Sequence, residues 1–65
     1  MPAHAPAKKI HERLRREVFR ALVEAQDAGS SVLQSRADVA RHFRIPAYEV
    51  RRIEGEGIDK DWPPL

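Results

Sequence analysis

Residues 35–57 read SRADVARHFRIPAYEVRRIEGEG, and this stretch predicts two short helices joined by a tight turn. Ser35 is followed three residues later by Asp38, a spacing typical of a helix start because both side chains accept hydrogen bonds from free backbone N–H groups. We therefore expect a helix over residues 35–44. Pro46 ends it, because a proline moves the residue before it out of the helical conformation.

The same proline suits the first turn of a second helix, since its fixed torsion is already helical. We expect that helix over residues 46–54, ending at Gly55 and Gly57, because glycine favours the left-handed cap position. Ala40 is small, as is required where two helices cross closely. The other five apolar side chains are expected to fill the angle between the helices: Val39, Phe43, Ile45, Val50 and Ile53.

A longer helix is expected before this pair, over residues 8–28 and ending at Gly29. Its apolar residues recur at helical spacing: Ile10, Leu14, Val18, Leu22 and Ala25. Phe19 and Val23 add a second apolar pair, which indicates either contact with two other helices or a dimer seam. Val32 and Leu33, in the link that follows, are expected to plug the core.

The chain divides into three parts on this pattern. Residues 1–7 are proline- and alanine-rich and are expected to form a disordered or extended arm, residues 8–57 the helical domain, and residues 58–65 a C-terminal tail. In the tail, Ile58 and Trp62 are expected to fold back and seal the core. The alternative is that the tail, through Trp62 and Leu65, holds a proline-containing segment out for a protein partner.

The composition of the chain excludes several classes of protein. A chain of 65 residues has room for one domain with a small core, and the absence of cysteine excludes disulfides, thiolate metal sites and thiol catalysis. No apolar run is long enough for a membrane span or a signal peptide, so we expect no membrane association and a cytoplasmic protein. The net charge of +2 divides into positive blocks at 1–20 and 35–53 and negative ones at 21–34 and 54–65, which favours one basic face.

The two helices and their turn have the outline of a helix-turn-helix. Residues 35–57 resemble the promoter-reading C-terminal domain of bacterial sigma factors and its small relatives, in which a run of Val-Ala, an apolar residue, a turn Ile, Val-Arg and Ile-Glu is common. The resemblance implies an all-α three-helix bundle and a DNA-reading surface. It covers about a third of the chain, and Arg44 stands where the family usually has a glycine in a left-handed turn position.

If the helix over 46–54 enters a major groove of double-stranded DNA, its outward residues are suited to base and phosphate contacts. Arginine can bond a guanine edge twice, alanine can touch a thymine methyl group, and tyrosine can reach a phosphate. Arg36 is expected to clamp a phosphate near the start of its helix, with Arg41 and Arg44 beside it. The alternative is a merely solvated basic face. The expected DNA-contacting residues are Arg36, Arg41, Arg44, Ala47, Tyr48, Arg51 and Arg52.

The sequence contains no motif that predicts metal binding, catalysis or a cofactor. His4, His11 and His42 are too scattered to predict a metal site, and no phosphate loop, nucleophile motif or carboxylate pair predicts an enzyme or a cofactor. The sequence therefore predicts a small DNA-binding transcriptional regulator acting as a homodimer. The main alternative is an adaptor of the same fold that binds RNA polymerase or another protein. A winged excisionase-like or MerR-like domain, with a wing opening at Gly57 and Ile58, is a third possibility.

Overall fold

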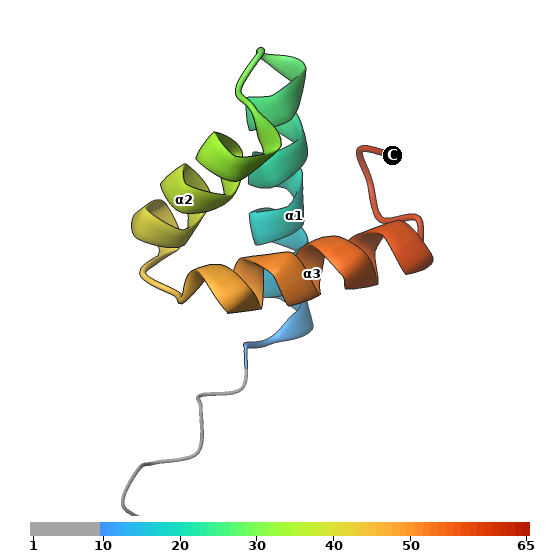
Figure 1. The fold of residues 1–65 in the computed structure, drawn as a ribbon. Helices are drawn as coiled ribbons and strands as arrows, with labels where there is room; N and C mark the ends of the chain where they lie inside the picture. Colours follow the sequence, from blue (N-terminus) through green and yellow to red (C-terminus); the bar gives the residue numbers. More distant parts are fainter. Residues whose placement is uncertain (1–9) are drawn as a thin grey trace, which may run out of the picture.

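The computed structural model describes residues 10–65 and contains three helices, α1 (Glu12–Asp27), α2 (Val32–Phe43) and α3 (Ala47–Asp59). Each helix packs against the other two, with α3 crossing in front of α1 and α2 inclined beside it (Figure 1). The predicted all-α three-helix bundle is thus confirmed. Within the described residues there is no strand, and the proposed wing at Gly57 and Ile58 is helical, so the winged alternative is wrong.

Helix α1 begins at Glu12, later than the predicted start at residue 8. Residues 8 and 9, like the arm predicted over residues 1–7, lie outside the described part of the chain. Ile10 and His11 are not helical, and the His11 side chain makes no capping hydrogen bond. The C-terminal end is close to the prediction: α1 ends at Asp27, and Gly29 follows with a φ of 109° that favours glycine.

Helix α2 begins three residues earlier than predicted, because Ser31 rather than Ser35 caps it. Ser31 Oγ accepts a hydrogen bond from Gln34 N at 3.1 Å, which is the usual bond of a serine N-cap. Ser35 is instead fully buried, donating to Val32 O and accepting from Gln26 Nε2. The early start also overturns the expected core role of the link, since Leu33 is 78% exposed and Val32 is exposed beside it.

Helix α3 runs through both glycines that were expected to end it. A Cβ built at Gly57 would lie 2.6 Å from Phe19 Cγ, so the missing side chain makes room for the aromatic ring. Gly57 is therefore a packing residue rather than a helix end, and Gly55 is exposed with open space around it. The helix ends at Asp59, and Asp61 in the turn that follows has a φ of 52°. Trp62 N then donates to Gly57 O at 2.9 Å.

The core lies where the three helices meet, with Trp62 as its lid. Trp62 is 2% exposed and meets the Phe19 ring edge to face, with centroids 6.1 Å apart. The predicted fold-back is confirmed for Trp62 but wrong for Ile58, which is 56% exposed. The remaining buried apolar residues come from all three helices: Val18, Leu22, Val39, Ala40, Val50 and Ile53.

The second apolar pair on α1 faces the inside of the domain. Phe19 is 1% exposed and Val23 packs against the core, so this pair belongs to the contact of α1 with its two neighbours. The expectation that Phe19 and Val23 form a dimer seam is wrong, because a ring already covered by Trp62 and Gly57 has no surface left to offer.

Candidate nucleic-acid interface

The turn between α2 and α3 contains a left-handed residue and two capping hydrogen bonds. Arg44 has φ 58° and ψ 46°, the left-handed conformation expected at this position. Arg44 N donates to Arg41 O at 3.3 Å and Ile45 N to Ala40 O at 3.0 Å, the bond pattern of a Schellman cap. An arginine in this conformation is strained by about 1 kcal/mol. The Ile45 side chain reaches the core, which fixes the direction in which α3 leaves the turn.

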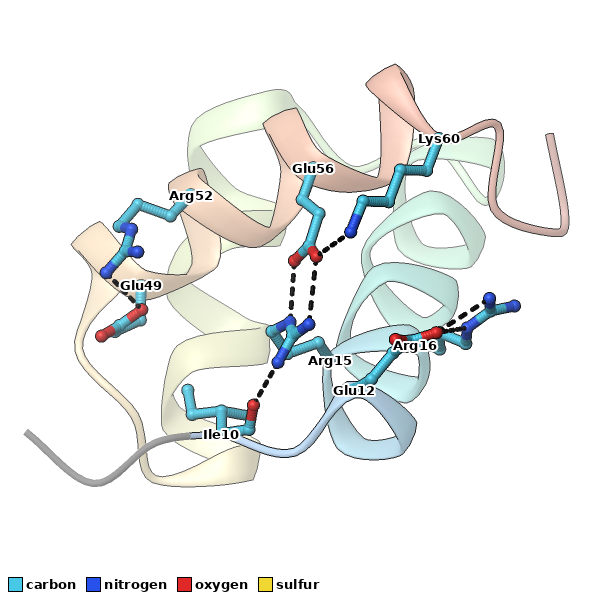
Figure 2. Close-up of polar contacts among 8 residues, drawn as sticks. All are labelled: Ile10, Glu12, Arg15, Arg16, Glu49, Arg52, Glu56 and Lys60. Atoms are coloured by element: carbon cyan, nitrogen blue, oxygen red, sulfur yellow. Dashed lines mark hydrogen bonds and ion pairs between the residues drawn. The ribbon is translucent and has the colours of Figure 1, made fainter.

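The first half of α3 exposes its predicted reading side chains together. Ala47, Tyr48, Arg51 and Arg52 are all exposed, while Val50 between them is fully buried. Arg52 lies 3.5 Å from the Glu49 carboxylate one turn back (Figure 2), and Arg51 has no ion-pair partner among residues 10–65. The structure thus leaves one basic, partly aromatic strip along the outward side of α3.

The end of α2 adds charge beside this strip. Arg41 bonds Asp38 at 2.7 Å but keeps 76% of its side chain exposed, and Arg44 in the turn is exposed as well. Pro46 provides no side-chain hydrogen bond to the start of α3. Six of the seven residues predicted to contact DNA, all except Arg36, lie within residues 41–52 and are exposed.

Arg36 does not fit its predicted role as a phosphate clamp. Because α2 begins at Val32, Arg36 lies beyond the first turn and away from the free N–H groups. Its guanidinium bonds Glu54 of α3, with Nη2 at 2.8 Å and Nε at 3.0 Å from Oε1, and both side chains are largely covered. Arg36 therefore holds α2 against α3, and its charge is already neutralised within the domain.

A second ion-pair cluster joins α3 to α1 at the other end (Figure 2). Arg15 bonds both carboxylate oxygens of Glu56, at 2.7 Å and 3.1 Å, and also donates to the Ile10 carbonyl. Lys60 Nζ lies 2.8 Å from Glu56 Oε2. The hydrogen bonds from Arg15 and then Lys60 lower the pKa of Glu56, and the bond to Glu56 raises the pKa of Arg15. Sequence spacing alone carries no signal for the Arg15–Glu56 contact, because it spans 41 residues.

Trp62 carries two cations over its ring. The Arg16 guanidinium carbon lies 5.1 Å and Lys60 Nζ 5.7 Å from the ring centroid, within range of a cation–π contact. Arg16 is also bonded to Glu12 one turn away (Figure 2). These contacts place the tail residue Trp62 inside the packed domain, so Trp62 is not available as an exposed ligand for a partner, whereas Leu65 remains exposed.

The described part of the chain contains neither a group of metal ligands nor a helix suited to span a membrane. Between residues 10 and 65, no three His, Cys, Asp or Glu side chains gather closely enough to hold a metal ion. His11 precedes α1 and His42 lies near the end of α2, and His4 falls outside the described residues. Among the helices described, none is both long and apolar enough to cross a bilayer.

Comparison of the chain with protein-family models, with curated proteins and with solved structures gave no match. The resemblance of residues 35–57 to the sigma-factor domain therefore stays a prediction. Function has to be argued from the geometry of α2, the turn and α3.

Proposed function

We propose that this protein binds double-stranded DNA, inserts the first half of α3 into the major groove and regulates transcription from the bound site. The observation that carries the proposal is the joint exposure of Tyr48, Arg51 and Arg52 on one side of α3. A helix whose outward side chains are arginines and an aromatic residue suits base edges and phosphates.

Two features of the surroundings support this orientation. Two of the acidic side chains of α3 have their charge paired within the domain: Glu54 is bonded to Arg36 and Glu56 to Arg15. The exposed Arg41 and Arg44 lie at the end of α2, where they would meet the sugar–phosphate backbone beside the groove. The domain therefore directs positive charge to the turn and the start of α3.

The test begins with a duplex selected by the wild-type chain from a pool of randomised double-stranded DNA. Binding to that duplex, kept short enough for one copy, is then measured over a range of salt concentrations for the double variant Arg51→Ala/Arg52→Ala. Loss of two arginines that reach bases or phosphates should weaken binding at least about tenfold and reduce the salt slope by about one per lost phosphate contact.

A charge-matched control removes two arginines from α1 instead of α3. The variant Arg13→Ala/Arg20→Ala lowers the net charge equally but alters only the outward face of α1, where both side chains are exposed. It should bind the selected duplex nearly as the wild type does, apart from a small general effect of net charge. Equal losses in the two variants would sink the assignment of α3 as the reading helix.

The second candidate function is a protein adaptor, and the exposed apolar residues at the start of α2 favour it. Leu33 and Val32 are exposed on the same turn of α2. Recovery of a partner from extract after nuclease treatment, lost in the variant Leu33→Ala, supports the adaptor. Recovery that depends on intact DNA and survives Leu33→Ala supports DNA binding.

A further inference from the structure

The outward face of α1 carries a regular stripe of alternating charge. Arg13, Glu17, Arg20 and Glu24 follow one another at intervals of four, three and four residues, which places them along one side of a helix. This side points away from the core, since Val18 and Leu22 are buried on the opposite side of α1. We call these four residues the α1 charge stripe.

The charges of the stripe are not used within the domain. None of the four residues forms an ion pair among residues 10–65, although neighbours of opposite sign lie three or four positions apart. The stripe forms the floor of an open depression, with Phe43 of α2 and Pro63 of the tail among its lining residues. Its side chains are thus accessible, and two apolar residues lie beside them.

The order of the charges makes the stripe complementary to itself when it is reversed. At 1.5 Å per residue the four positions are spaced by about 6.0, 4.5 and 6.0 Å, which is the same in either direction. In an antiparallel pair of stripes, Arg13 meets the partner's Glu24 and Glu17 meets the partner's Arg20, and each contact occurs twice. A parallel pair would place like charges opposite each other, which is unfavourable.

We propose that two copies of this chain associate through antiparallel α1 charge stripes, about a two-fold axis at the midpoint of the stripe. Such an interface is isologous, as in most homodimers. The occupant of the depression is then α1 of the second copy, with Phe43 and Pro63 bordering the contact. Ala21, which also lines the depression, is small enough to let the two helices approach closely.

The proposal predicts the strength, the salt dependence and the arrangement of the dimer. Exposed ion pairs are individually weak and screened by salt, so association should be detectable at high protein concentration and low ionic strength and should decline as salt rises. Because the stripe faces away from the core side of α1, where α3 packs, the two copies of α3 lie on opposite outer sides of the dimer. The interface requires no DNA and stands or falls independently of the proposed function.

Sedimentation equilibrium of the free protein at low salt tests the pairing through charge reversal. The variants Glu17→Arg and Arg20→Glu each place like charges opposite each other twice, and each should raise the dimer dissociation constant at least about tenfold. An equimolar mixture of the two variants restores every pair in a heterodimer and should sediment as the wild type does. The double variant Glu17→Arg/Arg20→Glu should likewise recover wild-type association in a single chain.

Controls separate pairing from net charge and from folding. Asp59→Arg and Arg51→Glu make the same changes of charge at exposed positions of α3 and should leave association unchanged. Glutamate and arginine are both good helix formers, so circular dichroism should show wild-type helix content in every α1 variant. A wild-type chain that stays monomeric at low salt, or a mixture of the single variants that fails to associate, overturns the proposal.

Discussion

The two halves of α3 differ in what holds them. In residues 47–52 only Val50 is buried and Glu49 is largely covered, while Ala47, Tyr48, Arg51 and Arg52 are exposed. In residues 53–59, by contrast, Ile53 is buried, Gly57 lies against Phe19, and two glutamates are bonded to other helices. Residues 53–59 therefore anchor α3 to the other two helices, and residues 47–52 carry most of the exposed side chains.

This difference explains how so small a domain can hold an exposed helix in a fixed direction. Arg36 of α2 and Arg15 of α1 approach α3 from two different helices and bond Glu54 and Glu56 respectively. The outward arginines of the first half take no part in these contacts. Changes in the second half should therefore affect stability, and changes in the first half should affect binding with little effect on stability.

The largest expected effect comes from the lid over the second half. Trp62→Ala removes the ring that packs on Phe19 and leaves a cavity, so the free energy of unfolding should fall by about 3 kcal/mol or more. Urea denaturation followed by circular dichroism measures the loss. Leu65→Ala, three residues on at an exposed position, is the control and should change stability little. Equal stability of the two variants would mean that the tail is not part of the fold.

The two glycines of α3 should respond in opposite directions to the same substitution. Gly57→Ala places a methyl group against the Phe19 ring and should destabilise the domain by about 2 kcal/mol, as overpacked cores do. Gly55→Ala meets open space within a helix and should stabilise it by about 0.5–1 kcal/mol. Thermal unfolding of both variants decides the matter, and a stabilising Gly57→Ala would contradict the packing role assigned to that residue.

The sequence predicted well what local rules control. Proline chemistry located the turn at Pro46, the family pattern indicated a left-handed residue at Arg44, and helical spacing identified Val39, Val50 and Ile53 as core residues. These features depend on torsions and periodicities within a few residues. They are therefore visible without knowledge of what lies across the domain.

The errors arose where a distant residue overrides a local preference. Gly57 suggested a helix end until Phe19, far away in the sequence, was seen to occupy the space of its missing side chain. Arg36 suggested a phosphate contact until Glu54 was found beside it. The start of α2 is a different error, because two serines can each begin a helix by local rules: Ser31 caps α2 and Ser35 is buried.

Substitution of Arg44 in the turn by glycine should change stability and DNA binding in opposite directions. Arg44→Gly relieves the left-handed conformation, and after allowance for the greater freedom of glycine in the unfolded chain it should stabilise the domain by about 0.5 kcal/mol. The same change removes an exposed positive charge beside α3 and should weaken binding to the selected duplex. Arg44→Ala is the control, since it removes the charge but keeps the strain. Stability that fails to rise in the glycine variant would contradict the strain argument.

A comparably small effect is expected in the pH dependence of the ion-pair cluster under the second half of α3. The bonds from Arg15 and Lys60 lower the pKa of Glu56 from its ordinary value of 4.5, so the unfolded chain takes up this proton at higher pH than the folded one. Glu56 therefore stabilises the fold at neutral pH, and its contribution is lost as the pH falls below 4.5 through the lowered pKa.

Because the side chains of Glu56 and Arg15 are both partly exposed, the contribution of Glu56 to the free energy of unfolding should not exceed about 1 kcal/mol. Urea denaturation of the wild type and of Glu56→Gln should give different free energies of unfolding at neutral pH, and the two values should converge in acid. A difference that persisted unchanged into acid would assign the role of Glu56 to its shape rather than to its charge.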